Sequence, residues 1–217
     1  MKNYTAFLLL LLTQTIFAQN KANNRFVWGF VVSAETQSLG IQPLNTRRPE
    51  NAAVQPRRPH LGGAAGFSLQ KRLWRGLSFQ PALSVAYNNN QVFFDQDGLR
   101  SYRFWDIELP LHLVVTDLRK RETPLRACVL FGGRIGWNLS KNPTELLHIS
   151  PERYALDLGL GAEIKWGKCR FQPAIIYSHG LNNIHLLDNA KYDWQAGRMV
   201  RDRLSFRLFI QMRRNDE

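Results

Sequence analysis

Residues 156–166 read LDLGLGAEIKW, in which every second position carries an apolar side chain. The positions between them carry glycine or a charged side chain. Successive side chains of a β-strand point to opposite faces of the sheet, so this pattern predicts a strand with one apolar and one polar face. The segment also has about the 9–11 residues that a tilted strand needs to cross a bilayer.

The same alternation occurs in seven further segments. They are residues 25–34, 61–69, 77–87, 105–115, 125–135, 170–178 and 203–212. No segment after residue 24 has a run of apolar residues long enough for a transmembrane helix. The sequence therefore predicts an all-β protein, an eight-stranded antiparallel up-and-down barrel.

A repeated phrase supports a barrel built from hairpins. FQPALSVAYNN begins at Phe79 and FQPAIIYSHGLNN begins at Phe171, which is 92 positions later (171 − 79). Each copy follows a similar strand and a short basic turn. We interpret the two copies as equivalent hairpins, formed by the second and third and by the sixth and seventh strands.

Alternation alone does not separate a soluble lipocalin-like barrel, which is apolar inside, from a membrane barrel, which is apolar outside. Two features favour a transmembrane barrel. Short connections (KRLWRG, DLRKRETP and GK) alternate with long ones at residues 35–59, 88–100, 138–152 and 180–200, as in outer-membrane barrels. The apolar face also carries aromatic residues near predicted strand ends, namely Tyr87, Trp105, Trp137, Trp166 and Tyr177.

The other face of the strands mixes small residues with charges of both signs. Because the interior of an eight-stranded barrel is filled by side chains, these charges should pair with one another inside it. The predicted lumen charge network comprises Asp106, Glu108, Arg126, Arg134, Asp157, Glu163, Arg170, Arg203 and Arg207. We expect this network to close the lumen.

The first residues predict export. MKNYTAFLLLLLTQTIFAQ has a basic start, an apolar run over 6–12 and a small residue at Ala18, which is typical of a secretory signal peptide over residues 1–18. Residues 19–217 then form one barrel domain in the outer membrane, with both mature termini in the periplasm. An exported protein does not meet chromosomal DNA, so we attribute the net charge of +12 to other contacts than nucleic acid.

Three prolines interrupt the predicted strands, at Pro81, Pro110 and Pro173. Proline cannot donate to a β-ladder, so we expect β-bulges to accommodate these residues. Two cysteines, Cys128 and Cys169, are too few for a disulfide scaffold. We place them on opposite faces of strands that are not neighbours, and expect them not to pair.

Several of these segments resemble the PorT-like outer-membrane barrels of the Bacteroidetes group. They are FWDIELPLHLVV from Phe104, LDLGLGAEIKWGKCRFQPAIIYSHGLNNI from Leu156 and DRLSFRLFIQM from Asp202. The resemblance spans roughly residues 60–213, and SHGLNN is its most specific element. It implies a structural or accessory role in type IX protein secretion. The chain departs from many outer-membrane barrels in running on through RRNDE after Met212 instead of ending on an aromatic residue.

No catalytic or metal site emerges from the sequence. Ser178 and His179 suggest a hydrolytic dyad, but neighbouring strand residues point to opposite faces. His179, His185 and Asp188 match no strong zinc spacing. We therefore predict a non-enzymatic barrel without a cofactor, and an outer-membrane lipid-modifying enzyme is the least favoured alternative.

Contact surfaces remain as the functional candidates. The basic turns that we single out contain Lys71, Arg72, Arg75, Arg119, Lys120 and Arg121. They could bind acidic patches of other secretion proteins or phospholipid headgroups. Four arginines of the first long connection, Arg47, Arg48, Arg57 and Arg58, could bind lipid phosphates or form a solvated loop. The expected partners are outer-membrane lipids and other secretion-system proteins, and the alternative function is a stand-alone narrow channel or a surface-binding barrel.

Overall fold

The computed structural model describes residues 26–42, 54–59, 61–117, 125–140, 146–167, 169–186, 191–192 and 196–212. The predicted signal peptide, residues 1–18, lies outside these ranges. The described strands are β1 (Phe26–Gln42), β2 (Val54–Pro59), β3 (Leu61–Trp74), β4 (Leu77–Phe94), β5 (Gly98–Thr116), β6 (Leu125–Asn138), β7 (Glu152–Trp166), β8 (Cys169–Gly180) and β9 (Arg198–Met212).

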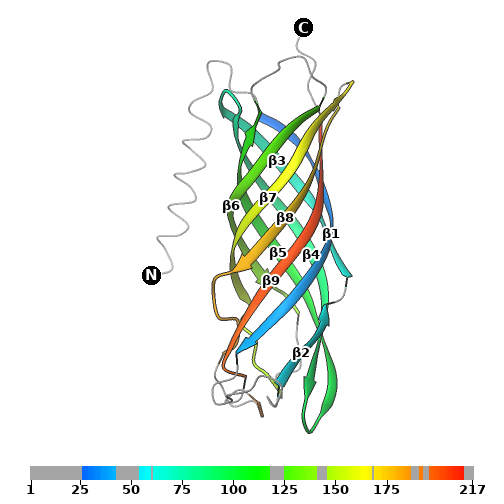
Figure 1. The fold of residues 1–217 in the computed structure, drawn as a ribbon, viewed down its shortest axis with the longest axis vertical. Helices are drawn as coiled ribbons and strands as arrows, with labels where there is room; N and C mark the ends of the chain where they lie inside the picture. The colour runs from blue at the N-terminus through cyan, green and yellow to red at the C-terminus, as the bar shows by residue number, and fades with distance from the viewer. Residues whose placement is uncertain are drawn as a thin grey trace.

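Eight of these nine strands close into a barrel (Figure 1). Neighbours around the ring are β1, β3, β4, β5, β6, β7, β8 and β9, and β9 pairs back with β1. Every pair is antiparallel, and β2 lies outside the ring because it pairs only with the far end of β4. The predicted eight-stranded up-and-down barrel is therefore confirmed, and β2 is an additional short strand within the connection expected at 35–59.

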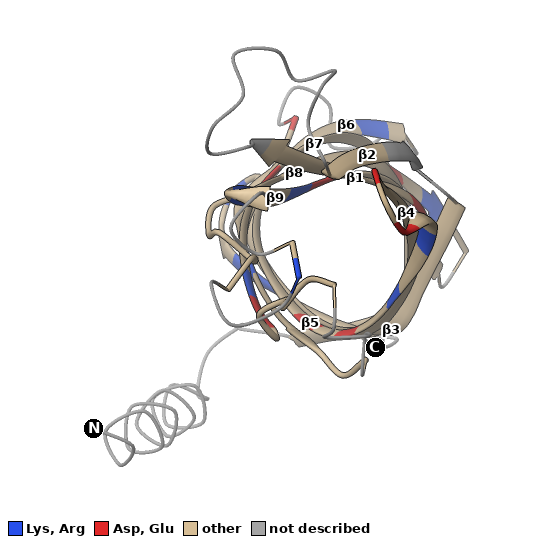
Figure 2. Cartoon of the chain, turned by 90° about the horizontal axis from the view of Figure 1, so that it is seen from below, with Lys and Arg blue, Asp and Glu red and all other residues tan. Residues whose placement is uncertain are grey.

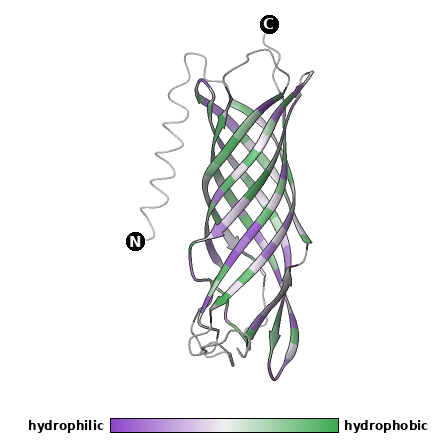
Figure 3. Ribbon diagram, viewed as in Figure 1, coloured by the Kyte–Doolittle hydropathy of each residue, from purple (hydrophilic) through white to green (hydrophobic). Residues whose placement is uncertain are grey.

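Most of the large apolar side chains of the barrel wall point outward. In β7, exposed and buried residues alternate, with Leu158 62% exposed and Asp157 3% exposed. Figure 3 shows apolar positions alternating with polar ones along the strands around the barrel. An apolar exterior around a polar interior is the arrangement of a membrane barrel, and the reverse of a soluble lipocalin-like one. Of the aromatic residues predicted near strand ends, Trp105, Trp137, Trp166 and Tyr177 are exposed on this outer face. The ring centres of Tyr87 and Trp105 lie 4.8 Å apart.

The two ends of the barrel differ. We call the end with the β3–β4 and β7–β8 turns the turn end, and the opposite end, with the β6–β7 and β8–β9 connections, the loop end. The connection predicted at 88–100 is not a loop, because β4 and β5 continue pairing to Phe94 and Gly98. They form a hairpin that extends beyond the barrel wall at the bottom of Figure 1, where β2 pairs with it. Gly98 adopts a φ of 72° beside the tight turn, which glycine tolerates best.

The prolines lie in the strands without the bulges that we expected. Pro81, Pro110 and Pro173 pair in register with Leu111, Arg134 and Leu208 on one side. On the other side the ladder stops and resumes without a shift, as between Gly161↔Ala174 and Ile164↔Phe171 in the β7–β8 pair. The missing N–H is therefore accommodated by a local gap in the ladder, which leaves the side-chain parity of each strand unchanged.

Both cysteines are free thiols, with Cys128 buried and Cys169 half-buried. Their strands, β6 and β8, are separated by β7 in the ring.

None of the described residues forms a helix that is long and apolar enough to cross a membrane.

Candidate functional site

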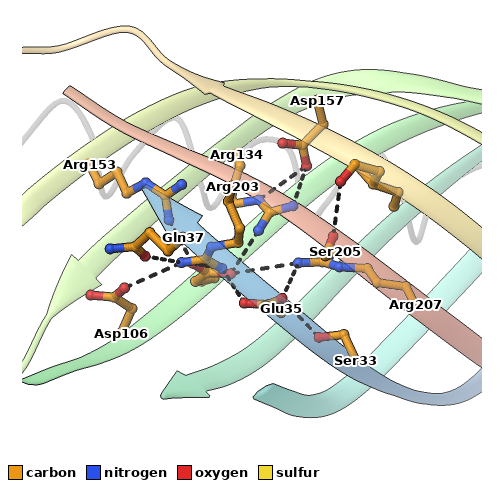
Figure 4. Close-up of polar contacts among 12 residues, drawn as sticks. Ser33, Glu35, Gln37, Asp106, Arg134, Arg153, Asp157, Arg203, Ser205 and Arg207 are labelled. Carbon is orange, nitrogen blue, oxygen red and sulfur yellow. Dashed lines mark hydrogen bonds and ion pairs between the residues drawn. The ribbon is translucent and has the colours of Figure 1, made fainter. Parts of the chain in front are cut away.

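The barrel interior contains a layer of buried charges, which we call the ionic layer. Figure 2 shows basic and acidic positions around the wall, and Figure 4 shows polar contacts in this layer. Its charged members are Glu35, Asp106, Glu108, Arg134, Arg153, Asp157, Arg201, Arg203 and Arg207, each at most 3% exposed. Side chains that line a water-filled channel would be accessible to solvent, so this near-complete burial indicates that the lumen is closed at this level.

Glu108 of β5 is the centre of the ionic layer. Its Oε1 lies 2.7 Å from Nη1 of Arg203 and 3.2 Å from Nη1 of Arg153. Its Oε2 accepts a hydrogen bond from Nη1 of Arg134 at 3.1 Å. Because these arginines come from β9, β7 and β6, one carboxylate connects four strands of the wall, including strands that are not neighbours.

Glu35 of β1 extends this layer to the strand pair that closes the barrel. Its Oε2 lies 2.7 Å from Nη1 of Arg203, and its Oε1 accepts a hydrogen bond from Nη2 of Arg207 at 3.2 Å. Arg203 and Arg207 are both on β9, which pairs directly with β1. The buried carboxylate of the first strand is therefore paired with two arginines of the last strand inside the closed barrel.

Two further carboxylates flank Glu108. Asp106 accepts hydrogen bonds from Nη1 and Nη2 of Arg201 at 3.4 and 2.6 Å. Asp157 accepts hydrogen bonds from Nε and Nη2 of Arg134 at 3.1 and 2.6 Å, and its Oδ2 lies 2.8 Å from Nε2 of His112. Paired charges of this kind are stable in a low-dielectric interior only when their partners remain in place.

A smaller polar cluster lies nearer the turn end. Arg170 Nε is 3.4 Å from Glu163 Oε1, and Arg170 Nη1 donates a hydrogen bond to Gln70 at 3.2 Å. The Arg170 side chain is 20% exposed, so water screens this pair more than the pairs of the ionic layer. Arg126, which we also predicted for the lumen, is half-buried opposite Glu163 in the β6–β7 register.

An apolar cluster covers the ionic layer at the loop end, and we call it the cap. Its buried members are Leu39, Val54, Val92, Phe94, Tyr102, Phe104, Leu147, Ile184, Tyr192, Ala196 and Met199. Backbone hydrogen bonds join the β6–β7 connection to the β8–β9 connection. Ser150 N donates to Ile184 O at 2.7 Å, and Leu186 N donates to His148 O at 3.0 Å. The guanidinium of Arg201 lies 4.1 Å above the Phe104 ring, so the cap packs directly on the ionic layer.

Asp97 connects the β4–β5 hairpin to the connection between β8 and β9 by hydrogen bonds. Its Oδ2 accepts hydrogen bonds from Lys191 Nζ and Tyr192 Oη, both at 2.7 Å. Two hydrogen bonds hold the pKa of the Asp97 carboxyl below its ordinary value. The bond from Lys191 has the larger effect and the bond from Tyr192 the smaller one. The Tyr192 ring also packs against Phe94 at 4.9 Å. The hairpin and the cap therefore form one connected structure at the loop end.

Sequence reasoning missed three charged members of the ionic layer. Glu35, Arg153 and Arg201 fall in or beside segments that we assigned to loops, because the strands extend further toward the loop end than the alternation suggested. Strand parity could have identified them, since Arg201 has the same parity as Arg203 and Glu35 lies on the polar side of β1. Of the predicted residues, Asp106, Glu108, Arg134, Asp157, Arg203 and Arg207 lie in the ionic layer, and Glu163, Arg170 and Arg126 lie nearer the turn end.

The Ser178–His179 pair does not form a dyad. Ser178 is fully buried on the lumen side, whereas the His179 side chain is 55% exposed on the outer face, with its Nδ1 2.9 Å from Asp202 Oδ1. His185 Nδ1 lies 2.8 Å from the carbonyl oxygen of Gly197, and Asp188 lies outside the described residues. Within the described ranges, no group of His, Cys, Asp and Glu is arranged to hold a metal ion.

The basic turns lie at the turn end as far as they are described. Arg72 and Arg75 are exposed, and Lys71 Nζ lies 5.3 Å from the centre of the Phe26 ring. Trp74, between the two arginines, is 75% exposed. Arg119, Lys120 and Arg121 lie outside the described residues, as do Arg47 and Arg48, and the side chains of Arg57 and Arg58 are likewise not described.

Three solved structures resemble this chain, and the first of them, OprG, agrees with the closed barrel. OprG of Pseudomonas aeruginosa superposes with a TM-score of 0.53 at 10% identity, over 88% of this chain and 96% of that chain. The outer membrane protein AlkL, studied in DMPC bilayers, gives 0.49 at 13% identity, over 92% and 96%. Neisserial surface protein A gives 0.41 at 9% identity, over 84% and 96%. At these identities, the likeness to OprG shows the fold alone.

No curated protein matches this sequence. A family model does: the model of the outer membrane protein beta-barrel domain matches residues 17–186, which is more than half of the chain. That match agrees with the closed ring of eight strands, the apolar exterior and the charged interior. The chain therefore belongs to the outer membrane protein beta-barrel domain family.

Proposed function

We propose that this protein is a non-conducting, non-enzymatic outer-membrane barrel that works by contact with other molecules. The observation that carries the proposal is the closure of the lumen at two successive levels, by the ionic layer and by the cap. A barrel that transports solute through its centre needs an open path, and these two layers occupy that path. Function then falls to the surfaces at the two ends and to the lipid-facing wall.

Each end offers a different contact surface. The loop end presents the β4–β5 hairpin, where Leu99, Arg100 and Arg103 are exposed. The turn end presents Arg72, Trp74 and Arg75. We place the loop end outside the cell and the turn end in the periplasm, with both termini, because short turns face the periplasm in bacterial outer-membrane barrels. The exposed apolar wall contacts outer-membrane lipids in this arrangement.

The absence of catalysis is part of the same proposal. Ser178 and His179 point to opposite faces of β8, and His179 lies on the outer wall beside Asp202. A nucleophile and its general base must lie within hydrogen-bonding distance, about 2.6–3.2 Å, to act together. This separation supports a structural role for the SHG element.

The closed lumen predicts a simple electrical result. Purified protein reconstituted into a planar bilayer should give no steady conductance steps, because ions cannot cross a layer of side chains that are almost completely buried. A 16-stranded porin in the same bilayers serves as the positive control. Stable, uniform channels from this protein would instead favour the narrow-channel alternative.

We further propose that the partners of this barrel belong to type IX protein secretion. The support is the resemblance of FWDIELPLHLVV and of the SHGLNN hairpin to the PorT-like barrels, and the periplasmic basic turns give that role a surface. Deletion of the gene should leave cargo proteins with type IX sorting domains in the periplasm, measured by fractionation and blotting. Restoration of the wild-type gene should release them.

A variant with Lys71→Gln, Arg72→Gln and Arg75→Gln should insert normally yet fail to restore export. Its matched control is Arg100→Gln with Arg103→Gln, which removes exposed charges from the loop end and should restore export fully. Normal cargo export in the deletion strain, with no second copy of the gene, would remove the secretion role. The proposal that the barrel does not conduct and works by contact would then be tested by the conductance measurement alone.

A further inference from the structure

The ionic layer contains more positive than negative charge. Its arginines are Arg134, Arg153, Arg201, Arg203 and Arg207, and its carboxylates are Glu35, Asp106, Glu108 and Asp157. Five guanidinium groups against four carboxylates leave one positive charge in excess (5 − 4 = +1) when His112 is neutral. An arginine cannot lose its proton under ordinary conditions, so the excess cannot be removed by titration of these side chains.

The excess is located at Arg153. Its partner among the described residues is Glu108, whose Oε1 it contacts at 3.2 Å and shares with the closer Arg203. Within the part of the chain that the structure describes, Nε and Nη2 of Arg153 have no hydrogen-bond partner, although the side chain is only 3% exposed. In contrast, Arg201 binds both Asp106 and Gln37, at 2.6 and 2.9 Å.

Neighbouring positive charges make the buried charge of Arg153 less favourable. Arg201 and Arg203 lie near enough for their positive charges to act on it. The apolar cap separates this level of the barrel from the loop end, and Phe104 of the cap already covers Arg201. Arg153 shares its carboxylate partner, Glu108, with Arg203, and incompletely neutralised buried charge is unfavourable. A group that supplies one negative charge would therefore stabilise the folded barrel.

The wall beside the stem of the Arg153 side chain is a glycine, which adds no side chain to this level of the lumen. Gly136 is its partner across the β6–β7 ladder, and a Cβ atom placed on Gly136 would come no closer than 3.7 Å to any neighbour. The atoms that it would approach are Cγ of Glu108 and Cβ of Arg153, at 3.7 and 3.8 Å. A methyl group at this position would therefore lie in ordinary van der Waals contact with the stems of Glu108 and Arg153.

We propose that the barrel interior binds one small monovalent anion of the chloride class, held by Nε and Nη2 of Arg153. The anion neutralises the excess charge of the ionic layer and acts as a structural component of the folded barrel. It is not transported, because the cap and the ionic layer enclose it. This inference is independent of the secretion role.

The test compares refolding in two salts. Protein unfolded in urea is refolded into detergent micelles in sodium chloride or in sodium gluconate at equal ionic strength, so that a buried site fills during folding. Binding to the folded state alone raises stability with ligand concentration, so the Tm in chloride should exceed that in gluconate and rise until the site saturates. Tryptophan fluorescence during heating measures the Tm.

Two variants and one crystallographic measurement complete the test. Arg153→Gln should remove the difference between the salts, whereas Arg103→Gln, at an exposed position on β5, should keep it. Crystals grown in bromide should show an anomalous peak within contact of the Arg153 guanidinium. Equal Tm values in both salts, an undiminished chloride effect in Arg153→Gln, or the absence of the bromide peak would each overturn the proposal.

Discussion

Glu108→Gln should destabilise the folded barrel more than any other single conservative change in the ionic layer. The carboxylate faces Arg134, Arg153 and Arg203 from inside the lumen and is fully buried. Glutamine preserves the shape but removes the charge, which leaves the arginines without their central counter-ion. Removal of one partner from a buried charged pair costs about 3–5 kcal/mol, so the free energy of unfolding should fall by about that amount.

Urea titration in micelles, followed by the heat-dependent shift in gel mobility, measures this loss. Glu152→Gln is the matched control, because Glu152 begins β7 at an exposed position on the loop end and should change stability little. Glu163→Gln should have an intermediate effect, since its partner Arg170 is partly exposed and also bonded to Gln70. An equal, small effect of all three variants would contradict a central role for Glu108.

Leu158→Arg should impair insertion strongly, whereas the same change at Leu99 should not. Leu158 is near the middle of β7 and is 62% exposed on the outer wall, so an arginine there would meet the hydrocarbon core. The expected cost is about 2–4 kcal/mol at mid-depth. Leu99 is 52% exposed on the hairpin beyond the barrel wall, where an arginine remains in water.

Folding yield into liposomes, scored by the gel shift and by protease protection, compares the two variants. Because both replace leucine with arginine at an exposed position, the difference isolates the position relative to the membrane. Equal yields would mean that the outer wall at Leu158 does not face lipid.

The alternation in the sequence was sufficient to predict the barrel and most of its polar interior. A period of two assigns each residue of a strand to one face, so Asp106, Glu108 and Asp157 could be placed in the lumen before any contact was known. Parity also separated Ser178 from His179. These predictions depend on local geometry alone, which is why they hold across all eight strands.

Contacts between distant segments could not be predicted in the same way. The cap joins Phe94 and Tyr102 of the hairpin to Ile184 and Tyr192 of the β8–β9 connection, and no local pattern indicates that these segments meet. The lengths of the strands were also underestimated. Polar residues such as Asn88 and Asn90 are typical of a loop, although they are buried in β4. The prediction of β-bulges at the prolines was wrong for a different reason. Each proline pairs with the strand on one side and interrupts the hydrogen-bond ladder only on the other side.

The seam between β1 and β9 has a consequence for the order of events during folding. Glu35 on the first strand meets Arg203 and Arg207 on the last one, and Glu108 meets Arg203 from the opposite side of the ring. An open sheet that lacks β9 would therefore leave Glu35 without its arginines and Glu108 without Arg203, on a surface that is about to leave water. Such an intermediate gains little by entering the bilayer before the seam forms. We therefore expect closure of the barrel and insertion into the bilayer to occur together, after the last strand has been synthesised.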